Sequence, residues 1–304
     1  MSSLIKAIVF SQPKRTVANI LLRKYSSDVP SYETLAVSVP KKNVFHVELN
    51  RPKKLNTFSK NMWRELTECF SALSDNKDCR VIILSGQGKH FTAGIELNSL
   101  VELATSIAEI DDVARKARHH YNFIKFAQDG ITALETCIKP VITVTHNACI
   151  GAGVNLIAAA DIRYCTEDAW FSVKEVDVGL APDVGALQRL PKIIGNTSIV
   201  RELCYTARKF DAKEAKEIGL VSQVFPDKDI ALKHVIELAE NIASKSPIAV
   251  QTAKMNLVYS QSRPNEDGLE HIRLLNSVNN QGEDLVKSAM AQVSKGPLPE
   301  FDDV

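Results

Sequence analysis

The stretch Cys149-Ile150-Gly151-Ala152-Gly153-Val154-Asn155-Leu156 decides how this chain folds around its most reactive centre. It follows a strand predicted over 140–144 and leads into an apolar helix predicted over 154–160. A helix that begins inside this stretch leaves its first N–H groups free and directs the positive end of its dipole at whatever lies above Ala152. Such a turn favours an oxygen atom that gains negative charge.

A second glycine turn, Ala93-Gly94-Ile95, follows a buried strand predicted over 81–84. If the two turns lie side by side, the N–H groups of Ile95 and Ala152 converge on one carbonyl oxygen. Removing one such donor typically costs about 3 kcal/mol of reaction barrier. The alternative is that both are ordinary turns between a strand and a helix, and the residues alone leave the choice open.

Two acidic residues follow the glycine stretch in apolar surroundings. Glu175 comes just after an apolar strand predicted over 170–173, and Asp183 lies in a loop that is otherwise apolar. Removal from water raises the proton affinity of a carboxylate toward the range that general acid–base catalysis uses. Glu175 and Asp183 are therefore the candidate catalytic residues. The alternative for each is an ordinary capping or surface acid.

Other glycine, cysteine and histidine patterns do not meet the requirements of known sites. The glycine stretch lacks the third glycine of a dinucleotide fingerprint, because residue 156 is leucine. Residues 86–90 lack the serine or threonine that ends a phosphate-binding loop. The six cysteines have no CxxC spacing, which favours reduced thiols. His119 and His120 point to different faces of a helix, so we expect both to be solvated and predict no metal site.

Short apolar strands alternate with helices through the first two thirds of the chain, which is typical of strand–helix–strand units with a parallel sheet. Ser59 is the expected N-cap of the first of these helices. The C-terminal third is predicted to be helical and to form a lid or an oligomerisation surface. Strands are predicted as a pair within 35–49 and at 81–84, 140–144, 161–165 and 170–173, and helices after Ser59, within 99–135 and at 154–160, 229–258 and 266–293.

Composition and charge indicate a globular chain with a distinct leader. The 304 residues are 45% hydrophobic and 24% charged, which suits a buried core. Residues 1–27 carry five basic and no acidic residues, typical of a mitochondrial transit peptide, with a disordered basic tail as the alternative. Residues 28–304 carry 32 basic and 36 acidic residues, so no nucleic-acid partner is predicted. The apolar runs are too short for a membrane span, and the expected compartment is the mitochondrial matrix.

Four segments together resemble the enoyl-CoA hydratase/isomerase (crotonase) superfamily, namely 91–97, 149–155, 161–164 and 174–180. Residues 173–192 are most similar to its Δ3,5-Δ2,4-dienoyl-CoA isomerases. The resemblance implies an α/β fold in which a crotonase-like spiral of ββα units covers 33–227. It also implies a helical C-terminal region over 228–304 that assembles the chain into homotrimers, commonly paired into hexamers.

The resemblance further implies an activity and a role for each site residue. The N–H groups of Ile95 and Ala152 would bind the thioester oxygen of an acyl-CoA substrate. Glu175 and Asp183 would transfer the protons that convert 3,5-dienoyl-CoA to 2,4-dienoyl-CoA in fatty-acid β-oxidation. Such proton transfer through an extended dienolate needs neither a metal nor a redox cofactor, and the substrate itself carries coenzyme A.

Asn155 departs from the pattern of the family, whose hydratases carry glutamate there and whose dienoyl-CoA isomerases carry aspartate. An asparagine cannot take a proton, which disfavours hydration, but it can hydrogen-bond a neighbouring carboxylate or the substrate. Two alternatives stay open: a Δ3-Δ2-enoyl-CoA isomerase that uses Glu175 alone, and a non-catalytic acyl-CoA-binding or scaffold protein. Lys54 and Lys254 are weighed as phosphate partners but are expected to be exposed and solubilising.

Overall fold

The computed structural model describes residues 31–304, and the predicted leader over 1–27 lies outside the described residues. At the centre of the described part is a six-stranded sheet in the order β1-β2-β3-β4-β6-β9. The first two strands are antiparallel, and the later pairs are parallel. Its strands are β1 (Leu35–Lys41), β2 (Val44–Leu49), β3 (Val81–Gly86), β4 (Val141–Thr145), β6 (Ile162–Thr166) and β9 (Gln223–Phe225).

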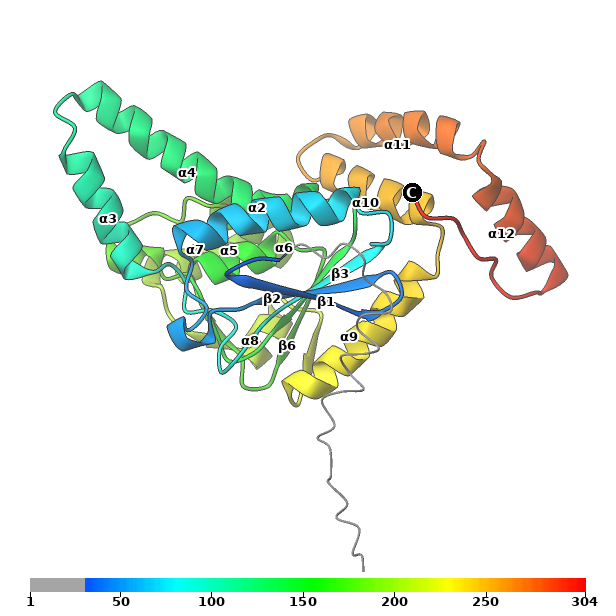
Figure 1. Cartoon of the computed structure of the whole chain (residues 1–304), viewed down its shortest axis with the longest axis horizontal. Helices are drawn as coiled ribbons and strands as arrows, with labels where there is room; N and C mark the ends of the chain where they lie inside the picture. Colours follow the sequence, from blue (N-terminus) through cyan, green and yellow to red (C-terminus); the bar gives the residue numbers. More distant parts are fainter. Residues whose placement is uncertain (1–30) are drawn as a thin grey trace, which may run out of the picture.

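Alternate residues of the central strands face two different cores. In β3, Ile82 and Leu84 join the larger core, whereas Val81 and Ile83 join the smaller one. Successive side chains of a strand point to opposite faces, and a parallel sheet is usually buried on both. Helices α2 (Lys60–Asp75) and α4 (Val113–Thr136) lie over one face and α9 (Lys228–Ala243) packs on the other (Figure 1). This double cover explains the continuous apolar run of β3.

The predicted strands and the cap at Ser59 are confirmed, with small shifts at the ends. The side chain of Ser59 accepts a hydrogen bond from the N–H of Met62 in the first turn of α2. The helical stretch predicted within 99–135 is divided into α3 (Leu97–Ala108) and α4, because Asp112 caps a new helix. These two helices form an arm that projects from the core at the upper left of Figure 1.

Several short elements were not predicted. A second sheet in the order β5-β7-β8 contains β5 (Ala148–Ile150), β7 (Trp170–Ser172) and β8 (Phe210–Asp211), of which only β7 was expected. Its strands have two or three residues each, too few for a pattern of alternation to be seen in the sequence. Five further elements were also not predicted, namely η1 (Pro52–Lys54), η2 (Glu175–Val178), α6 (Ala186–Ile194), α7 (Thr197–Thr206) and α8 (Ala212–Glu217).

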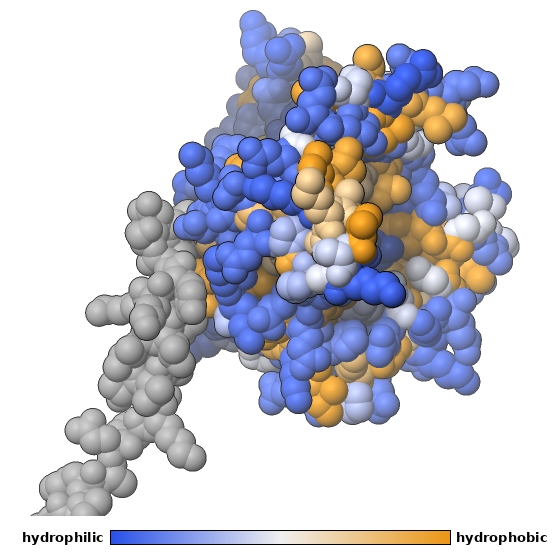
Figure 2. Space-filling view, turned by 90° about the vertical axis from the view of Figure 1, so that its right-hand side faces the viewer, coloured by the Kyte–Doolittle hydropathy of each residue, from blue (hydrophilic) through white to orange (hydrophobic). Residues whose placement is uncertain are grey.

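The C-terminal helices extend away from the sheet and expose apolar side chains. They are α10 (Pro247–Ser260), α11 (Asn265–Asn279) and α12 (Glu283–Ser294), and α12 lies at the right of Figure 1. Figure 2 faces that side of the molecule and shows orange apolar patches between blue polar ones. Within residues 31–304, no helix has both the length and the apolar character needed to cross a membrane.

Lys254 of α10 is buried, which corrects the expectation that it is exposed. Its Nζ donates to the carbonyl oxygens of Leu134 (3.0 Å) and Lys139 (2.9 Å) and pairs with Asp161 at 2.8 Å. The sequence gives no local indication that this lysine contacts three acceptors that are distant in the chain. These contacts fasten α10 to the end of α4 and to the start of β4.

We expect Lys254→Met to lower the free energy of unfolding by about 3 kcal/mol, because it removes the ion pair with Asp161 and leaves the buried carbonyl oxygens of Leu134 and Lys139 without their donor. Urea unfolding followed by circular dichroism would measure the change. Lys233→Met, at an exposed position of α9, is the matched control and should change the value by less than about 0.5 kcal/mol. Equal stabilities of the two variants would contradict the role of Lys254.

Candidate active site

The two glycine turns lie side by side because backbone hydrogen bonds join them. The N–H of Thr92 donates to the Ala148 carbonyl (3.0 Å), and the N–H of Ile150 donates to the Thr92 carbonyl (3.2 Å). A side chain at Gly153 would place its Cβ 2.4 Å from the Thr92 methyl carbon, so this position has room only for glycine. The sequence left open whether the two glycine turns lie side by side, and the structure shows that they do.

The N–H groups of Ile95 and Ala152 are the free donors at these turns. Within residues 31–304 neither group has an acceptor, whereas the N–H groups of Gly94 and Gly151 each have one. The Gly94 carbonyl accepts from the N–H of Phe58 (2.8 Å), so the Ile95 N–H in the same trans peptide points away from Phe58. Ala152 begins α5 (Ala152–Ala158), where the helix offers its N–H no partner and adds its dipole.

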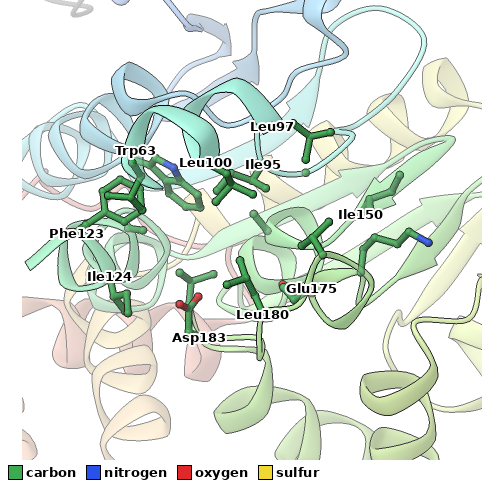
Figure 3. A pocket seen from close by; sticks show the side chains of 18 of the residues that line it. Trp63, Ile95, Leu97, Leu100, Phe123, Ile124, Ile150, Glu175, Leu180 and Asp183 are labelled. Carbon is green, nitrogen blue, oxygen red and sulfur yellow. The ribbon is translucent and has the colours of Figure 1, made fainter. Parts of the chain in front are cut away.

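Both donors open onto a cavity of about 320 Å³ between the arm and the loop that follows β7. Glu175, Leu180 and Asp183 lie along one side of it in Figure 3, and Trp63 and Leu100 lie along the other. Most of the lining is apolar, which excludes water from the polar groups that it does contain. The cavity thus brings together all four residues predicted to act, namely Ile95, Ala152, Glu175 and Asp183.

Glu175 is a partly buried acid with one bonded and one free oxygen. Its Oε1 accepts a hydrogen bond from Asn155 (2.7 Å), and its Oε2 is buried without a partner among the described residues. Burial raises the pKa of the Glu175 carboxyl group above its usual range, hydrogen bonds from its own backbone and from Asn155 lower it in part, and the charge of Asp183 raises it again. An acid with this increased proton affinity suits proton transfer at carbon.

Asn155 is fully buried behind the cavity wall and uses its amide to position Glu175. Its Nδ2 donates both to Glu175 and to the Gly151 carbonyl (2.9 Å), while its Oδ1 accepts from the N–H of Ala186 (2.6 Å). The expectation that Asn155 bonds a neighbouring carboxylate is therefore confirmed. The same side chain joins three elements, α5, η2 and α6, at the base of the site.

Asp183 is held by its backbone rather than by its carboxylate. Its carbonyl oxygen accepts from Gln128 Nε2 of α4 (2.7 Å), and nearby Arg189 of α6 pairs with Glu135 of α4 at 2.6 Å. Burial raises the pKa of the Asp183 carboxyl group, and its own backbone N–H and the charge of His120 lower it in part. The carboxylate itself is left to face the cavity.

His120 also lines the cavity, which corrects the prediction that both adjacent histidines are solvated. His119 is exposed, as expected. The signal that could have identified His120 is its spacing, because Phe123, Ile124 and Ala127 continue the same face of a helix. Within the described part of the chain, no group of three or more His, Cys, Asp or Glu residues is arranged to hold a metal ion.

A family model described as enoyl-CoA hydratase/isomerase matches residues 40–301. The chain belongs to this family. The rat protein named mitochondrial Δ(3,5)-Δ(2,4)-dienoyl-CoA isomerase is 50% identical over 267 residues, which cover 87% of this chain and 81% of the relative. The Arabidopsis thaliana protein named peroxisomal Δ(3,5)-Δ(2,4)-dienoyl-CoA isomerase is 45% identical over 87% of this chain and 96% of its own length.

Solved structures of the family share the fold. A putative enoyl-CoA hydratase from Streptomyces coelicolor aligns with a TM-score of 0.81 at 26% identity and covers 91% of this chain and 97% of that chain. The predicted fold class, an α/β crotonase-like core with a helical C-terminal region, is therefore confirmed. The resemblance of the four sequence segments to this family is confirmed as well.

We expect Asn155→Leu, which keeps the branched shape of the side chain but removes the amide, to raise the pKa of the Glu175 carboxyl group further above its usual range. The reason is that a hydrogen bond to a charged group contributes about 1.5–3 kcal/mol to the ionised form. Carbon-13 NMR titration of the glutamate side chains would measure the shift. Asn241→Leu, at an exposed position of α9, is the control and should leave the Glu175 pKa unchanged. A Glu175 pKa that stays constant in Asn155→Leu would show that Asn155 does not tune this acid.

Proposed function

We propose that this protein is an isomerase that converts 3,5-dienoyl-CoA to 2,4-dienoyl-CoA in fatty-acid β-oxidation. Relatives at about 50% identity carry the name of this activity, which supports the proposal. The observation that carries it is the placement of two acids of raised proton affinity, Glu175 and Asp183, in one apolar cavity beside two free N–H donors. The acyl-CoA thioester would be bound with its carbonyl oxygen between these donors.

The donors at Ile95 and Ala152 account for the first requirement of the reaction. Removing a proton from carbon 2 places negative charge on the thioester oxygen, and two fixed N–H groups with a helix dipole stabilise that charge without moving. The intermediate is an enolate that is conjugated through both double bonds to carbon 6. Because only protons are transferred in this scheme, it calls for no metal and no redox cofactor.

The positions of the two acids suggest how the protons are divided. A Cβ built on Gly151 would lie 3.8 Å from the Glu175 carboxyl carbon, so Glu175 sits against the turn that binds the thioester oxygen. We assign it to carbon 2, the carbon next to the thioester. Asp183 lies farther along the cavity, beyond Leu180 in the view of Figure 3, and we assign it to carbon 6.

Two alternative functions make different demands on Asp183. A Δ3-Δ2-enoyl-CoA isomerase returns the proton close to the thioester and needs Glu175 alone. A non-catalytic acyl-CoA-binding or scaffold protein needs neither acid, and a buried acid without use lowers stability. Asp183 is partly buried, and its carboxylate has no side-chain partner among residues 31–304, which favours the dienoyl isomerase over both alternatives.

We expect Glu175→Gln and Asp183→Asn each to lower kcat by at least about 100-fold, because general acid or base catalysis typically contributes 10²–10⁴-fold. The absorbance of the 2,4-diene would follow the reaction of purified residues 26–304 with 3,5-dienoyl-CoA. Asp177→Asn is the matched control, since Asp177 pairs with Lys174 at the surface and should leave kcat unchanged.

The same variants distinguish the alternatives. If Asp183→Asn loses dienoyl isomerisation but keeps any Δ3-enoyl-CoA isomerisation, the division of the protons between the two acids is supported. Undiminished dienoyl isomerisation by either variant would exclude the two-acid mechanism. Binding of the CoA ester without any reaction of the unaltered protein would favour the non-catalytic alternative.

We also propose that the protein works in the mitochondrial matrix as a homotrimer or a pair of trimers. The basic leader and the mitochondrial relatives support the compartment, although the plant relative is named peroxisomal. For the oligomer, the support is a set of apolar side chains on α10–α12 that are each at least half exposed, and clusters of this kind mark protein interfaces. They are Leu257, Leu269, Leu274, Val278, Leu285, Val286, Met290 and Val293.

We expect the double change Val286→Glu and Met290→Glu to reduce the mass of the particle in solution toward that of one chain. Charges placed in an apolar interface remain unpaired and oppose association. Analytical ultracentrifugation would measure the mass, and Gln292→Glu, which adds a charge at an exposed polar position of α12, is the control. An unchanged mass would show that this face of α12 does not form the interface.

A further inference from the structure

His120 is the polar member of an apolar helix face. It lies three, four and seven residues before Phe123, Ile124 and Ala127 on α4, and all four residues line the cavity. Its Nδ1 is buried without a hydrogen-bond partner among the described residues, while the residue as a whole is partly exposed. A buried ring nitrogen without a partner costs free energy, which calls for an explanation.

Asp183 is brought to the same region of the cavity by α4 itself. The Nε2 of Gln128, two turns after His120, donates a hydrogen bond to the carbonyl oxygen of Asp183 at 2.7 Å. In Figure 3 the Asp183 carboxylate lies on the side of Phe123 and Ile124, which follow His120 by about one turn. The His120 imidazole and the Asp183 carboxylate thus line one end of the cavity. Neither has a side-chain hydrogen bond among residues 31–304. The charge of the imidazole lowers the pKa of the Asp183 carboxyl group in part.

Few other charges reach this end of the cavity. The titratable or charged groups that line it with His120 are Asp183, Glu175 and Lys174, which come from the segment after β7. Lys174 is paired with Asp177, and Lys116 lies one turn earlier than His120 on α4. The side chains from α2 and α3 are apolar. We therefore take Asp183 as the acidic partner of His120.

The proposed reaction creates a need for such a partner. Each turnover breaks the C–H bond at carbon 2, giving a proton to Glu175, and forms a C–H bond at carbon 6 with a proton from Asp183. The product therefore leaves Glu175 protonated and Asp183 ionised, with no electrons gained or lost. Before the next turnover Glu175 must release a proton and Asp183 must recover one inside an apolar cavity.

We propose that His120 returns the proton to Asp183 between turnovers, as a positioning partner that acts through this acid and not on the substrate. Because the two side chains are not hydrogen-bonded to each other among residues 31–304, the imidazolium gives its proton to the Asp183 carboxylate through an intervening water. The neutral imidazole then takes a proton from solvent or from a buffer acid. This inference rests on the proposed isomerase function. Histidine side chains commonly carry protons between a buried acid and solvent near neutral pH.

The pairing can be tested without any activity. Carbon-13 NMR titration should show that His120→Leu raises the pKa of the Asp183 carboxyl group, because the neighbouring positive charge that favours its ionised form is lost. His119→Leu, an exposed neighbour on the same helix, is the matched control and should leave that pKa unchanged. An equal Asp183 pKa in the two variants would overturn the pairing, whatever reaction the protein catalyses.

The proton return is tested by rescue. In weak buffer, His120→Ala should lower kcat at least tenfold with little change in KM, and added imidazole should restore kcat by entering the space that the side chain leaves. His120→Gln, which keeps the size of the side chain, should be slow as well and should respond less. Full activity of both variants in weak buffer, or slow variants that imidazole does not restore, would overturn the proton return. An unaltered protein without activity would instead count against the isomerase function.

Discussion

The active site depends on the pairing of Thr92 with the strand that ends in the glycine stretch. Two backbone hydrogen bonds, to Ala148 and from Ile150, bring together turns that are more than fifty residues apart in the sequence. Gly153 permits the approach because any side chain there would overlap Thr92. Once the turns meet, the free N–H groups, the dipole of α5 and the walls of the cavity all follow from the same contact.

Burial gives the two acids their chemistry, and the fold must compensate for its cost. Among residues 31–304, the side chain of Asn155 donates a hydrogen bond to Glu175, and Gln128 holds Asp183 through the Asp183 carbonyl oxygen. A fully satisfied carboxylate would be a weak base, and an unsupported one would be poorly placed. The site lies between these limits, since the backbone and the Asn155 amide set positions while at least one acid oxygen remains available in the cavity.

The sequence predicts the large elements well, for reasons that are visible in them, and it singles out four residues that the structure brings together in one cavity. Strand β3 is a continuous apolar run because both of its faces are covered, and Ser59 caps α2 as its residue type suggests. The predictions for His120 and Lys254 were wrong because each depends on distant partners, a cavity for one and Asp161 for the other. Polar side chains on helices have no local signal for such contacts.

The hydrogen bonds of the Asn155 amide bear on whether the site can add water to a double bond. Its nitrogen carries two hydrogens, and both are committed, one to the Gly151 carbonyl and one to Glu175. Its oxygen accepts a hydrogen bond from the N–H of Ala186, and this bond distinguishes the amide oxygen from the amide nitrogen. No hydrogen of this group is left over to orient an attacking water beside Glu175. The valence of one amide thus favours moving a double bond over adding water across it.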